Sequence, residues 1–287
     1  MKTLGVIANT GKPRAAAVLA QLAALSRSLG LTLVARADTA AWMPGAAVVA
    51  DDQRFADVDA VLALGGDGTM LAAVRSLHGL NKPLIGVNIG SLGFMTSVSE
   101  QEMERALCCL RDETFIVSER SVAECVVQGP GGEERYCALN DVVVSSGTSS
   151  RVVRLEVSAG GSLVTTFVCD GLIVSTPTGS TGHSLSAGGP IILPETNAFV
   201  ISVICPHTLS SRPLVLPDQT LIRVRIGAAT HTLRLSVDGQ VGGVLRNNDV
   251  VEICRCARNV RFLHLPDYDY FSVLRRKLNW SGSTGIG

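Results

Sequence analysis

The sequence predicts an N-terminal α/β domain followed by a C-terminal β-rich domain. In the first hundred residues, short apolar runs alternate with segments whose apolar residues recur at helical spacing. This pattern is typical of a parallel sheet covered by helices on both faces. After about residue 113, β-branched segments follow one another between Gly, Asn, Asp and Ser turns, which indicates layered, mostly antiparallel sheets. At 287 residues the chain is long enough for both domains.

The N-terminal elements are predicted in order along the chain. The run "TLGVIA" at 3–8 predicts a buried strand. Residues 12–30 predict a helix, because Pro13 lies near its start, apolar residues recur at helical spacing and Gly30 follows its end. The same two patterns recur further on, as strands at 31–35, 58–64 and 83–88 and as helices at 70–77 and 100–112.

The second half of the chain supplies mostly strand patterns. We predict β segments at 115–128, 135–146, 151–158, 162–169, 221–227, 231–239 and 248–256. A last helical segment lies at 272–280. We therefore assign 1–99 to the α/β domain and 100–265 to the β-rich domain, and we expect 266–287 to pack back on the first domain.

Composition narrows the possible partners. Lys plus Arg and Asp plus Glu both number 25, so no overall basic excess suggests a nucleic-acid partner. None of the eight cysteines forms paired CxxC units, and buried thiols in a reducing compartment are the expected interpretation. The N-terminal apolar run is too short for a signal peptide, and no window reaches the ~18 apolar residues of a membrane span. We expect a soluble, cytoplasmic protein without a membrane partner.

The stretch "LGGDGTML" at 64–71 is the first candidate site. It lies between an apolar run and a helical segment, where glycines let the backbone approach a ligand and helix N–H groups attract phosphate. It matches neither GxGxxG nor a Walker loop. Phosphate binding leaves the acid, Asp67, unexplained, so a plain turn or N-cap role for Asp67 is the alternative.

The second candidate is the long segment from Cys169 to Ile192, "CDGLIVSTPTGSTGHSLSAGGPII". Ser, Thr and Gly dominate its centre, and no charge appears after Asp170. Hydroxyl and glycine N–H groups at this density suit a polyhydroxyl or phosphate-bearing ligand. A flexible Gly/Ser loop is the alternative, although the Pro-fixed "TPTGST" core argues against it.

Three shorter features are weaker on their own. Asn140 and Asp141 stand just before a strand, where an Asx turn would also explain them. His207 and Arg212 lie in "CPHTLSSRPLVLP", where a structural histidine is the commoner case. Asp238 lies in "SVDGQV", which is equally a hairpin signal.

Taken together and in this order, these segments resemble the ATP-NAD kinase family, whose members phosphorylate NAD to NADP. The resemblance rests on "GGDGTML", "GVNIGSLGFMT", "LNDVVV", "DGLIVSTPTGSTGHSLSAGGP", "PHTLSSRPLVLP" and "VDGQ", and it runs from Val6 to about Trp280. It implies a Rossmann-like α/β domain, a C-terminal β-rich domain as in the NAD kinase and diacylglycerol kinase fold, and an active site between domains. It also implies a homodimer or homotetramer.

The resemblance also implies roles for individual residues. Asp67 would be the general base toward the 2′-hydroxyl of the adenosine ribose. The implied NAD contacts are Gly68, Leu71, Phe94, Asn140, Asp141, Asp170, Thr181, Gly182, His183 and Ser186. The expected phosphate or ATP contacts are Gly65, Gly66, Thr69, Arg212 and Asp238. We expect ATP to carry Mg²⁺ or another divalent cation, without direct protein ligands.

This chain departs from the family pattern at two places. Gly182 and His183 stand where the family usually has Ala and Tyr, so a smaller ring that can titrate replaces an aromatic wall. Asp141 stands where the family usually has Glu.

Two alternative functions stay open. "GGDGT" also occurs in diacylglycerol and sphingosine kinases, and a close variant occurs in 6-phosphofructokinases, so a lipid or sphingoid kinase is the first alternative. The polar "TPTGSTGHS" loop argues against an acyl-chain site, which apolar side chains should line. The second alternative is a non-catalytic dinucleotide-binding regulator, against which the presence of Asp67 speaks.

Overall fold

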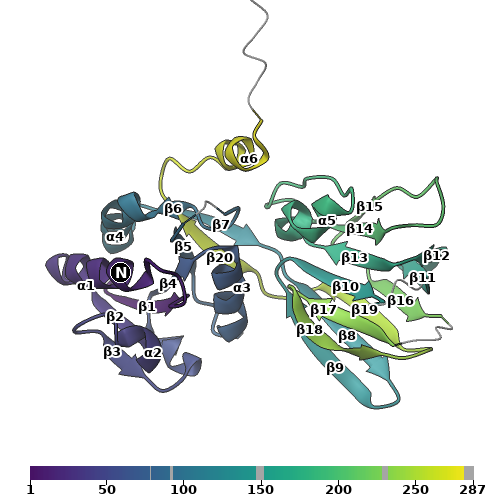
Figure 1. Ribbon diagram of the computed structural model, residues 1–287, viewed down its shortest axis with the longest axis horizontal. Helices are drawn as coiled ribbons and strands as arrows, with labels where there is room; N and C mark the ends of the chain where they lie inside the picture. The colour runs from purple at the N-terminus through teal and green to yellow at the C-terminus, as the bar shows by residue number, and fades with distance from the viewer. Residues whose placement is uncertain (78, 91–92, 147–151, 228–231, 281–287) are drawn as a thin grey trace, which may run out of the picture. The chain divides into compact units, whose positions relative to one another are not determined.

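The computed structural model describes residues 1–77, 79–90, 93–146, 152–227 and 232–280. The chain folds into two compact units, one formed by Met1–Ser118 and Val260–Gly287 and the other by Glu119–Asn259 (Figure 1). Of the expected segments, 281–287 and the first residues of 151–158 and 231–239 lie outside the described residues. No helix in the described ranges is long and apolar enough to cross a membrane.

The first unit is built on one large sheet with the strand order β3-β2-β1-β4-β5-β20-β7, and β6 also pairs with β5. The pairings from β3 through β5 to β20, and that of β6, are parallel. The strands are β1 (Thr3–Ala8), β2 (Thr32–Arg36), β3 (Ala47–Val49), β4 (Ala60–Gly65), β5 (Leu84–Asn88), β6 (Val98–Ser99), β7 (Ile116–Arg120) and β20 (Val260–His264). The strands predicted at 3–8, 31–35, 58–64 and 83–88 are confirmed, and so is the α/β class.

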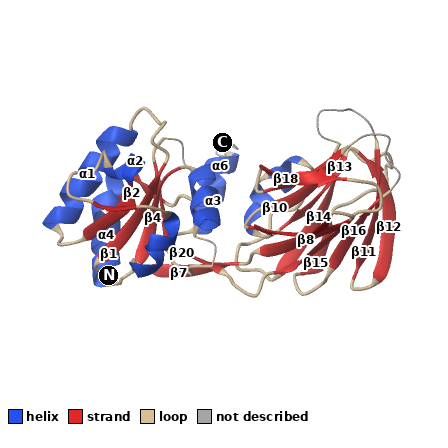
Figure 2. Ribbon diagram, turned by 90° about the horizontal axis from the view of Figure 1, so that it is seen from below, coloured by secondary structure: helices blue, strands red, loops and turns tan. Residues whose placement is uncertain are grey.

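Helices cover both faces of this sheet (Figure 2). The helices are α1 (Ala15–Ser28), α2 (Ala37–Ala40), α3 (Asp67–Ser76), α4 (Met103–Asp112) and α6 (Tyr270–Leu278), with 3-10 turns η1 (Asp52–Asp57) and η2 (Glu100–Glu102). Leu22 of α1 and Leu107 of α4 share a buried cluster with Leu62 of β4, so these two helices cover one face. Helix α3 packs on the other face (Figure 2) and buries Met70 and Ala73.

The first unit extends past the predicted boundary near residue 99. It continues to Ser118, because α4 packs on its sheet and β7 joins the sheet at its edge. Strand β20, which we assigned to the β-rich domain, instead pairs in parallel with β5. The five residues of β20 carry no local sequence signal that assigns them to one domain, so only their strand pairing shows that they belong to the first unit.

The second unit contains two six-stranded sheets with the orders β15-β14-β13-β10-β17-β18 and β12-β11-β16-β19-β8-β9. Every pairing described within them is antiparallel. The strands of the first sheet are β10 (Asp141–Ser145), β13 (Gly171–Ser175), β14 (Ala198–Ile204), β15 (Leu214–Pro217), β17 (Leu233–Val237) and β18 (Gln240–Leu245). The other sheet contains β8 (Ala123–Gly129), β9 (Gly132–Ala138), β11 (Val153–Ala159), β12 (Ser162–Cys169), β16 (Ile222–Ile226) and β19 (Val250–Arg255).

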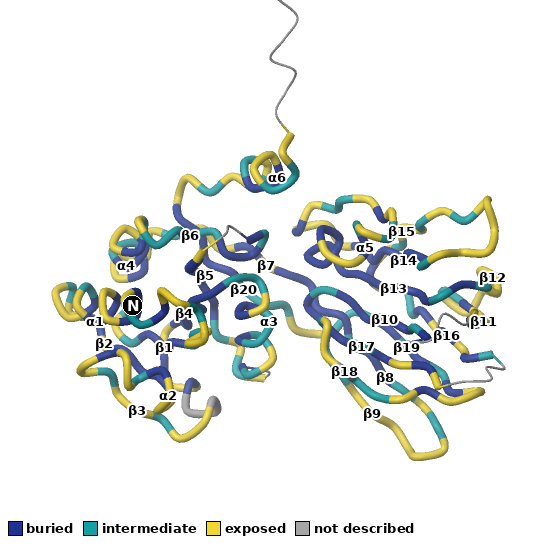
Figure 3. The backbone as a smooth tube through the Cα atoms, viewed as in Figure 1, coloured by how far each residue is buried: buried dark blue, intermediate teal, exposed yellow. Residues whose placement is uncertain are grey.

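Apolar side chains from both of these sheets form a single buried core. Strand β14 is almost wholly buried, whereas β9 and β12, at the two edges of their sheet, are mostly exposed (Figure 3). The prediction of a layered, antiparallel β domain is therefore confirmed. Between β13 and β14 the chain forms the 3-10 turn η3 (Thr178–Thr181) and the short helix α5 (His183–Ser186).

Candidate functional site

The loop that carries Asp67 is a sharp turn from β4 into α3. Gly65 ends the buried strand, and a Cβ there would lie 2.0 Å from the Thr69 hydroxyl oxygen, so no larger residue fits. Gly66 is the N-cap of α3 and Asp67 is its first residue. The N-cap alternative for Asp67 is therefore wrong, and its carboxylate is available for other partners.

Two backbone N–H groups hold the Asp67 carboxylate in one orientation. Oδ2 accepts from the Phe94 N–H at 2.8 Å, and Oδ1 accepts from the Met95 N–H at 2.9 Å. The neighbouring Gly93 leaves the necessary space, because a Cβ there would lie 1.9 Å from Oδ1. Each carboxylate oxygen can still accept another hydrogen bond. Asp67 is half-buried, so a ligand hydroxyl can reach it.

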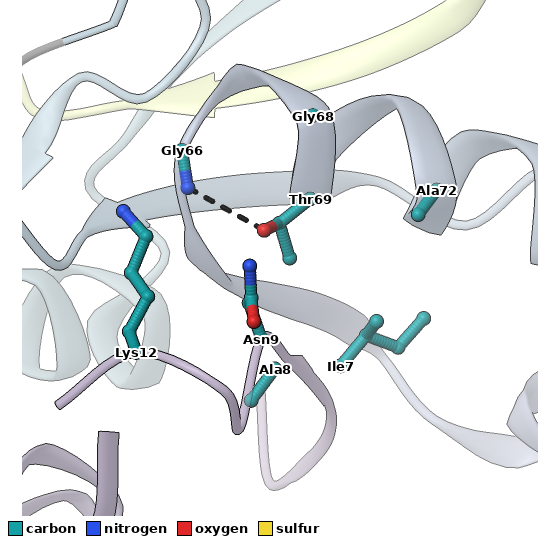
Figure 4. A pocket seen from close by; sticks show the side chains of 8 residues that line it. All are labelled: Ile7, Ala8, Asn9, Lys12, Gly66, Gly68, Thr69 and Ala72. Atoms are coloured by element: carbon teal, nitrogen blue, oxygen red, sulfur yellow. Dashed lines mark hydrogen bonds between the residues drawn. The ribbon is translucent and has the colours of Figure 1, made fainter.

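A cavity of about 380 Å³ lies beside this turn (Figure 4). It is lined by Ile7, Ala8, Asn9, Lys12, Gly66, Gly68, Thr69 and Ala72. The Gly66 N–H donates to the Thr69 hydroxyl at 3.4 Å, as the dashed line shows. The cavity therefore meets the N-terminus of α3, where exposed N–H groups and the helix dipole attract anions.

Lys12 supplies the cation that sequence reasoning missed. Its ammonium donates to the Ile89 carbonyl at 2.6 Å and lies 3.5 Å from the Gly65 carbonyl. Figure 4 shows its nitrogen on the same side of the cavity as Gly66. The signal was available, because Lys12 follows the first strand, and neighbouring parallel strands bring their carboxyl ends to the same edge of a sheet.

In the second unit, the Asp238 carboxylate holds a turn. Its carboxylate accepts the N–H groups of Leu139, Asn140 and Asp141 at 2.9, 2.7 and 3.2 Å. Asp238 itself lies in the tight turn between β17 and β18, with φ of 50°. This geometry favours the hairpin interpretation over the predicted phosphate contact, which would also bring two negative groups together.

Asp141 is the first residue of β10 and is only 5% exposed. Burial raises the pKa of its carboxyl to about 7, and the charge of Asp238 adds to this effect. A carboxyl group with such a pKa carries a proton for part of the time near neutral pH. It can therefore donate a hydrogen bond as well as accept one.

The segment around η3 packs closely on the same turn. The Thr176 N–H donates to the Asn140 carbonyl at 2.9 Å, and the Thr176 hydroxyl donates to the Leu139 carbonyl at 2.5 Å. A Cβ at Gly179 would lie 2.1 Å from the Asn140 carbonyl oxygen. All four residues of η3 are buried, so the flexible-loop alternative is wrong.

Two buried side-chain oxygens near η3 lack partners. Within the described ranges, neither Asn140 Oδ1 nor Thr178 Oγ1 has a hydrogen bond. Because a buried polar atom without a partner costs free energy, these atoms are candidates to receive a polar ligand. Thr178 was not among the predicted site residues, although it lies in the "TPTGST" string.

The other predicted residues lie at several places in the fold. Gly182, His183 and Ser186 are exposed beside the buried Thr181, while Leu71 and Phe94 are half-buried in the first unit. Asp170 lies at the opposite end of β13 from Thr176, so the fold separates it from the Asn140 turn. Arg212 is exposed and donates to the carbonyls of Leu209 and Ser211 in its own loop.

Comparison with known proteins gives matches over nearly the whole chain. The family model described as the ATP-NAD kinase N-terminal domain matches residues 5–113, and the one described as the ATP-NAD kinase C-terminal domain matches residues 139–265. NAD kinases of Syntrophotalea carbinolica and Geotalea daltonii are each 39% identical over 282 residues, covering 98% of this chain and 99% of the relative.

Two solved structures share the fold. Yeast NADH kinase complexed with NADH has a TM-score of 0.93 at 23% identity, covering 100% of this chain and 90% of that one. An NAD kinase from Archaeoglobus fulgidus in complex with ATP has a TM-score of 0.77 at 22% identity, covering 98% and 100%.

Proposed function

The chain belongs to the ATP-NAD kinase family, and we propose that it transfers the γ-phosphoryl group of ATP to the 2′-hydroxyl of the adenosine ribose of NAD, giving NADP. One observation carries the catalytic assignment. Asp67 is the first residue of α3, and the backbone N–H groups of Phe94 and Met95 orient its carboxylate. Next to it lies the cavity that Lys12 lines.

In this mechanism Asp67 acts as general base. Its carboxylate accepts the proton of the 2′-hydroxyl while the hydroxyl oxygen forms the new bond to phosphorus and the bond to the leaving ADP oxygen breaks. The proton needs an acceptor within hydrogen-bond reach, and the two fixed N–H donors leave the outer lone pairs of the carboxylate for it. Holding the base in a fixed orientation contributes to the rate enhancement, because reacting groups must be aligned.

The phosphates of ATP would bind at the cavity beside α3. Lys12 supplies a positive charge there, and the Gly68 N–H with the Thr69 hydroxyl supplies neutral donors. This lining contains ammonium, amide and hydroxyl groups and no carboxylate, which fits a Mg²⁺ ion held by the phosphates. When bound, that ion neutralises charge on the transferred group.

Residues of the second unit would bind NAD. Asn140 Oδ1 and Thr178 Oγ1 are buried acceptors without partners, and they suit N–H or O–H groups of the dinucleotide. Asp141, Thr181, Gly182, His183 and Ser186 keep their predicted NAD contacts in this proposal, as do Gly68, Leu71 and Phe94 in the first unit. Asp238 supports them indirectly by holding the turn of residues 139–141.

The position of Asp170 supports a homo-oligomer. Since Asp170 lies at the far end of β13 from the Asn140 turn, its predicted ribose contact would serve the site of a second subunit. A homodimer or homotetramer would provide that subunit. The eight free cysteines fit a reducing compartment, and we propose a cytoplasmic location.

A single assay tests the function. The purified protein receives NAD, NADH and a diacylglycerol as acceptors, with labelled ATP or polyphosphate as donor and Mg²⁺ present. NADP(H), labelled lipid and bound NAD are measured. We expect phosphorylation of the dinucleotide. Label in the lipid alone would support the lipid-kinase alternative, and NAD binding without product would support a regulator.

A further inference from the structure

A basic side chain from the C-terminal helix contacts the turn that holds Asp67. The Lys277 ammonium lies 5.5 Å from the centroid of the Phe94 ring. The backbone N–H of that same Phe94 donates to Asp67 Oδ2, and the next N–H, from Met95, donates to Oδ1. A single residue, Phe94, therefore links Lys277 to the Asp67 carboxylate, although Lys277 lies near the other end of the chain.

Helix α6 carries Lys277 on its buried face. Its N-cap, Asp269, accepts the N–H groups of Phe271 and Ser272, both at 3.0 Å. Val273 and Leu274 are the buried residues of the helix. Lys277 follows them by four and three positions, which places it on the same face.

A second anchor lies just before the helix. The Arg105 guanidinium makes a bidentate pair with the Asp267 carboxylate at 3.0 and 2.9 Å. Lys277 itself is half-buried. Within the described part of the chain it has no carboxylate partner, so the Phe94 ring is its electrostatic contact.

We infer that Lys277 is a positioning residue for phosphoryl transfer. The ammonium is attracted to the face of the ring, which restrains Phe94 and with it the two peptide N–H groups that orient Asp67. A base that is displaced or rotated loses alignment with the hydroxyl, and this lowers kcat. The inference rests on the proposed role of Asp67 as general base.

The test compares Lys277→Met with Lys277→Arg and with Arg276→Met. Arg276 is the adjacent basic residue, exposed, with a hydrogen bond to Ser272 of its own helix. We expect Lys277→Met to lower kcat by about 3- to 30-fold, the range of a partly desolvated cation–π contact, with KM for ATP unchanged within about 2-fold. Lys277→Arg should restore most of the rate, because guanidinium also binds aromatic faces, and Arg276→Met should match the wild type.

A double-mutant cycle shows whether the effect passes through the ring. Phe94→Leu keeps an apolar side chain but removes the aromatic face, so adding Lys277→Met to it should cause no further loss of kcat. Equal losses of kcat in both backgrounds would overturn the inference. An unchanged kcat in Lys277→Met, or a raised KM for ATP alone, which would indicate a direct phosphate contact, would also overturn it.

Hydrogen exchange gives a readout that does not depend on activity. The peptide containing Phe94 and Met95 should exchange faster in Lys277→Met than in the wild type or Arg276→Met, at an unchanged melting temperature. An unchanged exchange rate would refute the positioning role. If Asp67→Asn retained turnover, the proposed function of Asp67 would fail separately, while exchange would still report whether Lys277 holds the turn.

Discussion

Replacing Asp67 by Asn is the most informative perturbation of the proposed active site. The substitution keeps the shape of the side chain but removes its negative charge and its ability to take a proton. In the structure both oxygens accept backbone N–H groups, from Phe94 and Met95. One of these acceptors becomes an NH₂ group in the variant, so the substitution also affects the turn.

The two effects differ in size. An NH₂ group that faces a backbone N–H leaves that donor unpaired, at a local cost of about 1–3 kcal/mol. Loss of a general base lowers the rate of proton transfer by about 10²- to 10⁴-fold. We therefore expect kcat of Asp67→Asn to fall by at least about 10²-fold, with NAD binding largely retained because the NAD contacts in the second unit are untouched.

Thr96→Val is the matched control for the turn. The Thr96 hydroxyl accepts the Gly93 N–H and the Asn88 amide, both at 3.2 Å. Its removal loosens the same turn but leaves the Asp67 carboxylate in place. In this control, kcat from steady-state NADP formation and the NAD affinity from calorimetry should each fall by less than about 10-fold. The base assignment would be refuted if Asp67→Asn kept near-normal turnover, or if Thr96→Val lost as much as Asp67→Asn.

Lys12→Met should raise KM for ATP by about 10- to 100-fold, the value of a charge-assisted hydrogen bond, while KM for NAD stays constant; equal changes in both would contradict a phosphate role. Gly179→Ala should destabilise the fold by about 1–3 kcal/mol, because its Cβ meets a backbone carbonyl at 2.1 Å, whereas Gly131→Ala, in open space, should leave the melting temperature unchanged. The folded-state pKa of Asp141 is about 7 against an ordinary 3.8, so the folded protein binds a proton that the unfolded chain has released, and this group's contribution to stability falls as pH rises between those values. Asp141→Asn should remove this loss of up to about 4 kcal/mol. In urea unfolding, the free energy of unfolding of the variant should exceed that of the wild type by more at pH 8 than at pH 5. A difference that does not change with pH would count against the raised pKa.

The local patterns of the sequence were sufficient to predict most strands and helices of the first unit. Strands β1, β2, β4 and β5 and helices α1, α3 and α4 appear where periodicity predicted them, because residues three or four apart share a helix face and alternate residues share a strand face. Periodicity did not reveal short elements such as β3 and β6, which contain too few residues to show a period.

The sequence by itself determined the two fold classes, the family and the importance of the Asp67 loop, because each depends on residues that are close together in the chain. Only the tertiary structure decided which distant groups meet. It brought Lys12 to Ile89 and Asp238 to the turn of residues 139–141, and it separated Asp170 from that turn. The physical reason is that such neighbours are set by strand order and pairing, which hydrophobic periodicity within a segment does not encode.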